Sequence, residues 1–433
     1  LRTAEHYPFG TLSETLKVLS MEYYYIAMLA FLACLACFDL FVGVSNDAVN
    51  FLNSALGSRI ASFRTTMWVA TFGVLLGATF SSGMMEIARS GVFHPQMFNF
   101  TEIMVIFFAV MIADIVLLDT FNSLGLPTST TVSIVFELLG SAIAAAAFKL
   151  YMEGGSFQLI FDYINTSKSL TIISGILISV VVAFFSGAVV QYIMRLIFSF
   201  HYERVYPWFG GVFGGMSITA IAYFLVMKGA KGASFMRPEW IEWIDANTKM
   251  LVIALFIGFS VLFQVLIMVS KFNIFKVVIL AGTFSLAFAF AGNDLVNFVG
   301  VPLAAYDSFR EWQASGLSPD ALMMDGLLKP TKANTFFLLA SGLVMVLTLW
   351  FSRKAHRVLQ TALSLSAQQS DHEQFGSSIP GRVIVRASMG LGSIINQIIP
   401  GVVKEGIDMG MRNPAGSVNA ELVAKNAKIY GII

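Results

Sequence analysis

The stretch that decides the fold is GVSNDAVNF at residues 43–51, which closes a long apolar run near the start of the chain. A second copy, GNDLVNFVG at residues 292–300, closes another apolar run far downstream. Both copies read Asn-Asp-x-Val-Asn-Phe, so they agree in their side chains as well as in their hydropathy. A duplicated polar cluster within duplicated apolar segments indicates a membrane protein built from repeats.

The composition also points to the membrane. Of the 433 residues, 57% are hydrophobic and only 12% are charged, and the mean hydropathy is +0.76. Ordinary soluble domains carry about 25% charged residues. The net charge of +1 and the lack of a basic patch with interleaved aromatic residues argue against a nucleic-acid partner. We therefore expect the lipid bilayer to surround the protein.

Two cysteines, Cys34 and Cys37, lie in the first apolar run. Their spacing would suit a redox or metal pair, but no second pair and no histidine cluster accompanies them. A small apolar packing face explains them better.

Apolar runs of about 20 residues, the length that crosses the hydrocarbon core, recur along the chain. We expect membrane spans at residues 23–43, 67–87, 103–121, 170–198, 208–227, 251–269, 277–290 and 336–351. The sequence thus predicts an all-α polytopic membrane protein of the inverted-repeat type, with broken or re-entrant helices at the midplane. The small-residue run that ends near Phe148 is short enough for a re-entrant hairpin as well as for a full span.

Three further expectations concern where helices end. Gly43 and Gly57 bracket the first motif, which predicts a helix that breaks and resumes there. Pro302 is expected to close the second motif. The segment 228–249 is expected to be a loop that anchors the protein at the lipid surface through tryptophan and arginine.

These runs divide the chain into five parts. We expect a polar or interfacial segment at 1–22, a first transmembrane repeat at 23–200, connecting helices at 201–275, the start of a second repeat at 276–352 and a polar region at 353–433. Basic residues favour a cytoplasmic place for the last part. Within it, residues 393–411 carry isoleucine and valine at helical spacing, which suits the membrane surface or a small soluble domain equally well.

Each motif places its polar side chains on one face of a helix. Asn46, Asp47 and Asn50 are three or four residues apart, a spacing that brings side chains together on a helix. The same holds for Asn293, Asp294 and Asn297. Carboxylates in hydrocarbon are costly and usually line an ion path, a relay or a cavity. The alternative is that the clusters only join helices through hydrogen bonds.

The second informative stretch is PTSTT at residues 127–131. Proline ends the preceding helix and suits the start of the next. Ser129, Thr130 and Thr131 then occupy the N-cap and first turn, where hydroxyl groups and backbone N–H groups are available. A helix N-terminus binds phosphate or similar oxyanions without lysine or arginine. Capping of a buried helix is the alternative interpretation.

With these motifs the chain resembles the inorganic phosphate transporter (PiT) family of secondary carriers. That family carries a duplicated Gly-x-Asn-Asp-x-x-Asn segment and a Pro-Val-Ser-Thr-Thr turn in each repeat. The matching segments here are residues 46–50, 292–297 and 127–131.

The chain departs from this pattern in three places. The resemblance implies a second Ser-Thr-Thr turn after Phe351, and the sequence has none there, so the second repeat is expected to be incomplete. Residues 71–73 lack the acid that members often carry after the first motif. Thr128 replaces the usual valine, a change that we expect to be mild.

The resemblance implies cation-coupled phosphate uptake by alternating access between two inverted repeats. The implied phosphate-binding residues are Asp47, Asn50, Ser129, Thr130, Thr131, Asp294 and Asn297. The candidates for ion coupling are Asn46, Asp47, Asn293, Asp294 and Glu137, with Na⁺ at Asp47 and Asp294. Glu137 serves equally well as a hydrogen-bonded packing partner. No cofactor is implied beyond Na⁺ or H⁺, and we expect a homodimer in the inner membrane of a bacterium.

Two aspartates suit an anion site if each has a further task. A carboxylate can accept a hydrogen bond from a P–OH group, and it can bind the coupling cation. Sulfate carries no proton near neutral pH, so each carboxylate, a hydrogen-bond acceptor, would face a sulfate oxygen that is also an acceptor. The rival interpretations are a sulfate or other oxyanion permease, an intramembrane aspartyl hydrolase that uses Asp47 and Asp294 as a dyad, and a channel.

Overall fold

Helices make up almost all of the described chain. The computed structural model describes residues 12–80, 91–198, 202–229, 236–270, 272–329 and 335–366, and the single residues 386 and 390. The α-helices are α1 (Leu12–Gly57), α2 (Phe63–Phe80), α3 (Phe100–Leu124), α4 (Thr130–Met152), α5 (Ile160–Tyr163), α6 (Thr166–Phe198), α7 (Tyr206–Phe224), α8 (Pro238–Ser270), α9 (Ile274–Ser315), α10 (Thr335–Phe351) and α11 (Arg353–Ser366). Short 3₁₀ turns and a π-turn at Leu225–Gly229 join them. The described residues form no strand, and their β-pairing is limited to two isolated bridges.

Seven of these helices are long and apolar enough to cross a membrane. They are Ser20–Gly57 within α1, α3, α4, α6, Tyr206–Met227 around α7, α8 and α9. The segments Phe336–Phe351 and Arg353–Leu363, in α10 and α11, are bent by 65° and count as an eighth span if taken together. The prediction of an all-α polytopic membrane protein is confirmed.

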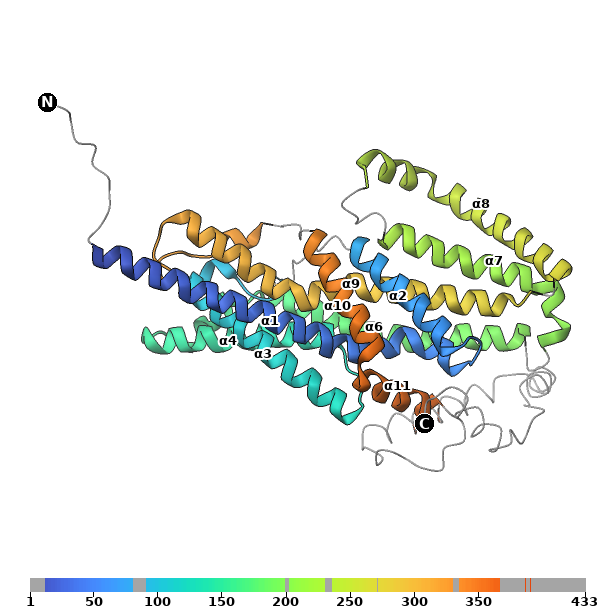
Figure 1. Cartoon of the computed structure of the whole chain (residues 1–433), viewed down its shortest axis with the longest axis horizontal. Coiled ribbons are helices and arrows are strands. Elements are labelled where there is room, and N and C mark those ends of the chain that lie inside the picture. Colours follow the sequence, from blue (N-terminus) through green and yellow to red (C-terminus); the bar gives the residue numbers. More distant parts are fainter. Residues whose placement is uncertain are drawn as a thin grey trace.

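Two long helices organise the bundle. The 46-residue α1 and the 42-residue α9 pack against each other, and each carries one copy of the Asn-Asp motif. Figure 1 shows α3 beside α1 with α4 next to α3, while α7 lies along the first part of α9 and α8 lies on the other side of α7. Helices α2 and α10 pack against each other and against α1 and α9, and α11 packs on α1.

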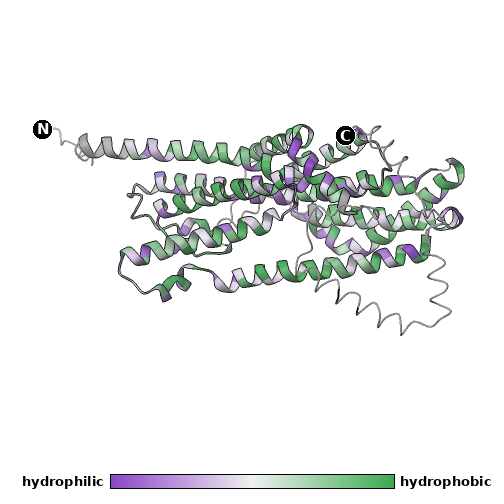
Figure 2. Cartoon of the chain, turned by 90° about the horizontal axis from the view of Figure 1, so that it is seen from below, coloured by the Kyte–Doolittle hydropathy of each residue, from purple (hydrophilic) through white to green (hydrophobic). Residues whose placement is uncertain are grey.

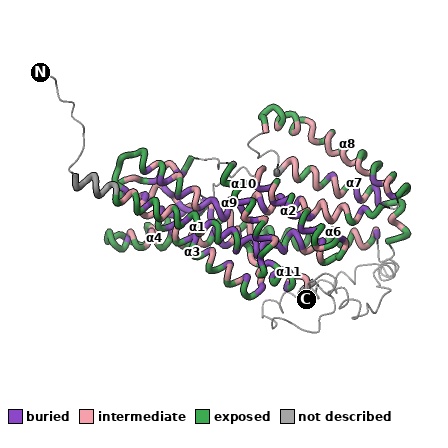
Figure 3. Tube along the Cα trace, in the orientation of Figure 1, coloured by how far each residue is buried: buried purple, intermediate pink, exposed green. Residues whose placement is uncertain are grey.

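The buried side chains follow the same division. One apolar cluster joins the first half of α1 to α3, α4 and the last part of α9. A second joins the motif half of α1 to α2, α9, α10 and α11. Figure 3 shows buried positions concentrated along the middle of the bundle, where α1 and α9 meet. Most of the helical ribbon is hydrophobic (Figure 2), and many large apolar side chains are exposed, including those of α6, whose most apolar 18-residue window has no buried residue. This is the pattern of a bundle that faces lipid.

Glycines allow α2 to approach α9 closely. A Cβ atom at Gly73 would lie 2.6 Å from the carbonyl oxygen of Phe284, and a Cβ atom at Gly77 would overlap the backbone of Phe288. The spacing of the two glycines is that of a G-x-x-x-G contact, which lets helix backbones meet in the membrane. Phe284 and Phe288 lie shortly before the site residues on α9, so this backbone contact with α2 helps to fix the position of those residues.

Two predicted helix ends are wrong. Helix α1 continues through Gly43 without a break, and α9 continues past Pro302 to Ser315, where Gly316 ends it with a φ of 66°. In hydrocarbon an unpaired backbone group costs several kcal/mol, so an intact helix is favoured wherever no neighbour replaces the lost bonds. Gly43 instead provides space for a side chain of α9.

A third prediction is wrong in part. Residues 238–249, expected within an interfacial loop, form the first turns of α8. Pro238 stands at the helix start, where the missing N–H of proline does no harm. Residues 393–411, for which a helical spacing was noted, lie outside the described residues. The same is true of residues 81–87, the end of the second predicted span.

Candidate phosphate site

The two motif aspartates meet where α1 and α9 cross. Asp47 is 3% exposed and Asp294 is 2% exposed. Their carboxyl groups lie within hydrogen-bonding reach of each other. Two ionised carboxylates in this position would repel strongly, so the pair requires a shared proton, a cation or a hydrogen-bonding ligand between them. The paired motifs therefore form one site.

The packing around the aspartates is reciprocal. Gly43 and Phe290 each precede their aspartate by four residues, and Phe51 and Phe298 each follow by four. The ring of Phe298 occupies the space that a Cβ at Gly43 would need. The ring centroids of Phe51 and Phe290 are 6.1 Å apart. Each motif phenylalanine thus packs on the position four residues before the other aspartate, as expected for helices related by an approximate two-fold axis.

The turn between α3 and α4 brings the Ser-Thr-Thr segment to this crossing. Gly125 ends α3 with a φ of 72°, and the backbone N–H of Leu126 donates to the Phe121 carbonyl at 2.9 Å. Ser129 is the N-cap of α4, and its hydroxyl accepts from the N–H of Val132 at 3.3 Å. These local bonds reverse the chain at Pro127, so the first turn of α4 begins inside the bundle.

The side chain of Asn46 holds this turn in place through hydrogen bonds. Its Oδ1 accepts from the backbone N–H of Thr128 at 2.7 Å, and its Nδ2 donates to Asn122 Oδ1 at 2.8 Å and to the Leu126 carbonyl at 3.0 Å. Asn122 in turn donates to the Val42 carbonyl at 2.7 Å. With donor and acceptor both used, Asn46 acts as a positioning residue in this arrangement.

Thr130 and Thr131 connect the turn to both motifs. The hydroxyl of Thr130 donates to Asp47 Oδ2 at 3.1 Å. The hydroxyl oxygen of Thr131 accepts from Asn297 Nδ2 at 3.0 Å and from Asn293 Nδ2 at 3.2 Å. One helix start therefore supplies neighbouring hydroxyl groups to motifs that lie about 250 residues apart in the sequence.

Two predicted site residues lie at the edge. Asn50 is exposed and donates to Asp47 Oδ1 only at 3.4 Å. Ser129 is exposed as well, and its hydroxyl is used to cap α4. The name pocket is used for the six side chains that these contacts join, namely Asp47, Thr130, Thr131, Asn293, Asp294 and Asn297.

Glu137 lies apart from this pocket, in a second group of acids. Its Oε1 is 2.7 Å from the hydroxyl oxygen of Ser133, which is 2.6 Å from Asp114 Oδ1. Asp39 of α1 completes the group. Glu137 was predicted from sequence, whereas Asp39, Asp114, Ser133 and Asn122 were missed as partners. Buried acids at 39 and 114 in apolar runs were the available signal.

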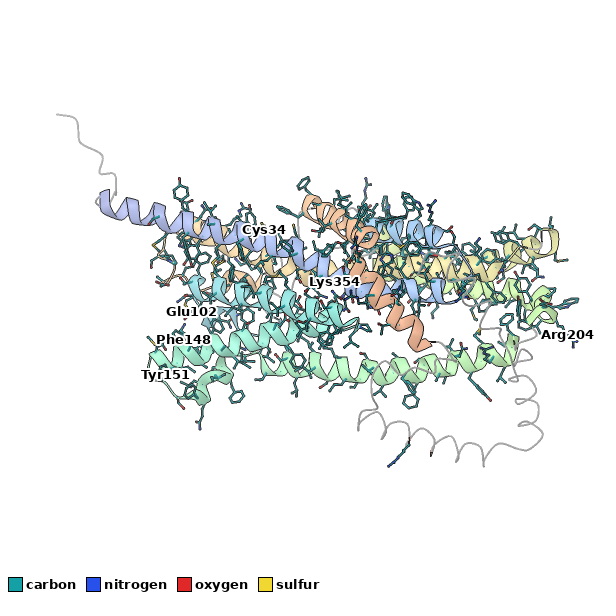
Figure 4. The ribbon with its side chains drawn as sticks, turned by 60° about the horizontal axis from the view of Figure 1, so that its bottom comes forward. Cys34, Glu102, Phe148, Tyr151, Arg204 and Lys354 are labelled. Atoms are coloured by element: carbon teal, nitrogen blue, oxygen red, sulfur yellow. The ribbon has the colours of Figure 1, made fainter. Side chains whose placement is uncertain are left out.

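Among the described residues, no lysine or arginine is hydrogen-bonded to the six side chains of the pocket. Two ion pairs, Lys149 with Glu102 and Lys354 with Asp119, lie elsewhere and are partly exposed. Figure 4 shows Glu102 on α3 and Lys354 at the start of α11, and both residues are half-buried. An anion in the pocket would therefore be bound by hydroxyl groups, amides and a helix N-terminus.

A bundle of membrane-length helices with a buried, duplicated polar site at its centre defines a polytopic membrane transport protein. Residues 43–378, more than half of the chain, match the model of the phosphate transporter family, and the chain belongs to that family. It is therefore an integral membrane protein of a transporter family, which agrees with the prediction that it is not an enzyme.

Individual relatives are similar over shorter stretches. A candidate phosphate permease of Thermococcus kodakarensis is 27% identical over 124 residues, which cover 28% of this chain and 30% of that protein. A sodium-dependent phosphate transporter of Plasmodium falciparum is 33% identical over 119 residues, covering 27% of this chain and 18% of that protein. The chain thus spans less than a third of the length of the curated relatives that it matches.

A solved structure shares the fold. The sodium-dependent phosphate transporter matches with a TM-score of 0.53 at 20% identity, over 78% of this chain and 78% of that one. At this identity the match shows the fold alone.

Proposed function

We propose that the protein is a secondary transporter that takes up inorganic phosphate together with Na⁺ or H⁺. The observation that supports this most directly is the bridge that Thr130 and Thr131 make between the two motifs, beside the paired carboxyl groups of Asp47 and Asp294. The names of the similar proteins agree with phosphate as the substrate.

The pocket offers both kinds of hydrogen-bonding group that a protonated phosphate needs. The hydroxyl groups of Thr130 and Thr131 and the amides of Asn293 and Asn297 donate to phosphate oxygens. Asp47 and Asp294 accept from P–OH groups. The bonds that now join these residues to one another are exchanged for bonds to phosphate, so that no buried polar group is left without a partner.

The same carboxyl groups provide the coupling to a cation. Two ionised aspartates would repel phosphate, and a bound Na⁺ or proton removes that repulsion. The anion and the cation therefore enter the pocket together. Because sulfate has no proton to donate, it leaves each aspartate facing an acceptor and binds poorly.

The reciprocal packing of α1 and α9 supports alternating access as the transport mechanism. Two halves related by an approximate two-fold axis can rock about a fixed site and open it to either side in turn. We place the transporter in the cytoplasmic membrane of a bacterium as a homodimer, in keeping with the resemblance.

Uptake into proteoliposomes tests the proposal. Labelled phosphate is supplied with an inward Na⁺ gradient, and then with a proton gradient alone, with sulfate as competitor. We expect uptake under one gradient, little competition by sulfate and loss of uptake in Asp47→Asn. Asp162→Asn, at an exposed position, is the matched control and should leave uptake unchanged. Folded protein that takes up no phosphate under either gradient, or that prefers sulfate, would overturn the proposal.

A further inference from the structure

A second group of acids lies inside the bundle, between α1, α3 and α4. Asp39 and Asp114 are fully buried, Ser133 is 7% exposed, and Glu137 is half-buried. Asp39 precedes Asp47 by eight residues on α1, which corresponds to about 12 Å along a helix. The group is therefore distinct from the phosphate pocket but close to it, and the function proposed above makes no use of it.

The two contacts of the Ser133 hydroxyl group require a proton on one of the neighbouring carboxyl groups. Its oxygen is 2.6 Å from Asp114 Oδ1 and 2.7 Å from Glu137 Oε1. A serine hydroxyl has one proton and can donate to only one of them. The other contact is attractive only if that carboxyl group is itself protonated and donates to the serine oxygen. At least one proton is therefore held on Asp114 or Glu137.

Asp39 leads to the same conclusion independently. Neither of its carboxyl oxygens has a hydrogen-bond donor, and both are buried. Its carboxyl group lies within hydrogen-bonding reach of Asp114 and feels the charge of Glu137. Asp114 Oδ2 and Glu137 Oε2 are also buried without a donor. A buried carboxylate without a donor is costly, and a proton between Asp39 and Asp114 removes the cost.

The charged groups described around this site are all acidic. The titratable groups around each acid are the other two acids, and Asp47 acts on Asp114 from farther along α1. On α9, Asp294 faces Asp47. The described ion pairs do not include any of these residues. A proton held on one of the carboxyl groups offsets the repulsion among them.

We propose that Asp39, Asp114, Ser133 and Glu137 form a proton-binding site, separate from the phosphate pocket, that takes up and releases a proton in the transport cycle. An O–H bond forms on one carboxylate when the site opens to the side of higher proton concentration, and it breaks when the site opens to the other. The part concerning transport rests on the function proposed above, whereas proton binding itself does not.

The proton-binding site lies close to the phosphate pocket along both α3 and α4. Ser133 and Thr130 lie within one turn of α4, and Asp114 and Asn122 lie two turns apart on α3. The charge of Asp114 also reaches Asp47. Loss of the proton places a negative charge near Asp47 and thereby weakens anion binding in the pocket.

Infrared spectroscopy of the reconstituted full chain tests proton binding without any transport. The C=O stretching band of a protonated carboxylic acid is recorded while the pH is raised, for the wild type, Asp39→Asn and Glu137→Gln. We expect a band in the wild type that disappears at high pH and is reduced in both variants. Asp162→Asn and Glu153→Gln, at exposed positions, should leave the band unchanged. A band unaffected by Asp39→Asn and Glu137→Gln, or one removed by Na⁺ at constant pH, would overturn the proposal.

The pH profile of phosphate uptake tests the role in transport. We expect wild-type uptake to fall by up to about tenfold per pH unit above the titration of the site, the limit for release of one proton. The profile should be flatter in Glu137→Gln and unchanged in Glu153→Gln. An identical profile in Glu137→Gln would overturn the transport role. If the wild type takes up no phosphate but retains the infrared band, the proposed function fails while the proton site stands.

Discussion

The side-chain oxygen of Asn46 accepts the backbone N–H of Thr128 at 2.7 Å, which ties the first Asn-Asp motif to the turn before α4. Asn293 has the same place in the second motif but is exposed and donates to Thr131 instead. The two copies of one motif therefore have different tasks. The first asparagine positions the Ser-Thr-Thr turn, and the second faces the pocket that the turn helps to form.

Asn46→Ala should destabilise the protein. It leaves the Thr128 N–H, the Leu126 carbonyl and Asn122 without the partner that each now has. An unsatisfied buried group costs about 1–3 kcal/mol, so we expect a clear fall in the melting temperature of the detergent-solubilised protein. Phosphate uptake should fall as well, because Asn46 no longer holds the Ser-Thr-Thr turn in place.

The matched control is Asn247→Ala. Asn247 is half-buried on α8 and donates only to a carbonyl of its own helix, so this change should be nearly neutral. Equal melting temperatures for the two variants would show that the hydrogen bonds of Asn46 to the turn do not stabilise the protein.

Thr131→Val should affect uptake more than stability. Valine has the shape of threonine but cannot accept from Asn293 and Asn297 or donate to phosphate. One hydrogen bond is worth about 0.5–1.5 kcal/mol, so we expect uptake at low phosphate to fall by up to about tenfold. Thr131→Ser keeps the hydroxyl group and should retain most of the activity.

The control for this change is Thr120→Val. Thr120 is exposed on α3, and its hydroxyl donates to the Val116 carbonyl of the same helix. Uptake assays at several phosphate concentrations compare the three variants. Full uptake in Thr131→Val would show that the Thr131 hydroxyl group does not contribute to phosphate binding.

The sequence predicted the parts of the site but not their arrangement. The motif spacing placed Asp47 and Asp294 on inward helix faces, and the proline at 127 predicted the helix start that brings Thr130 and Thr131 inward. Both predictions depend on local rules, namely helix periodicity and capping chemistry. That Asn46 binds the turn whereas Asn50 is exposed depends on how α3 lies against α1, which local rules do not determine.

Gly43 illustrates the same limit. A glycine beside a polar motif fits a helix break as well as a close helix contact, and only the position of Phe298 on α9 decides between them. Ser352 was likewise predicted only as the last residue of the second repeat. Its partner, Ser45, lies far away in the sequence, and no spacing pattern could reveal it.

Ser352→Ala should loosen the bend between α10 and α11. The Ser352 hydroxyl pairs with that of Ser45 at 2.6 Å and accepts the N–H of Ala355 at 3.2 Å, so it joins the first motif helix to the start of α11. Loss of an N-cap costs about 1 kcal/mol, and Ser45 loses its partner as well. We expect a lower melting temperature than for Ser318→Ala, at an exposed position. No difference between them would mean that the bend is held by apolar contacts alone.

Gly43→Ala tests the crossing of the two motif helices. The new methyl group would occupy the space of the Phe298 ring, which is fully buried. Overpacking in a dense core costs about 1–3 kcal/mol, so the melting temperature should fall and the two aspartates should be displaced from each other. Gly140→Ala is the control, because a Cβ there meets nothing within 4 Å, and alanine favours the helix by about 1 kcal/mol.

A double-mutant cycle separates this clash from a general intolerance of alanine in α1. Phe298→Leu alone should destabilise the protein, since it removes part of a fully buried ring. Combined with Gly43→Ala it should cost less than the sum of the two single changes, because the smaller side chain makes room for the methyl group. Additive losses would mean that Gly43 is needed for a reason other than Phe298. A recovery of both melting temperature and phosphate uptake in the double variant would tie the distance between α1 and α9 directly to the function of the pocket between them.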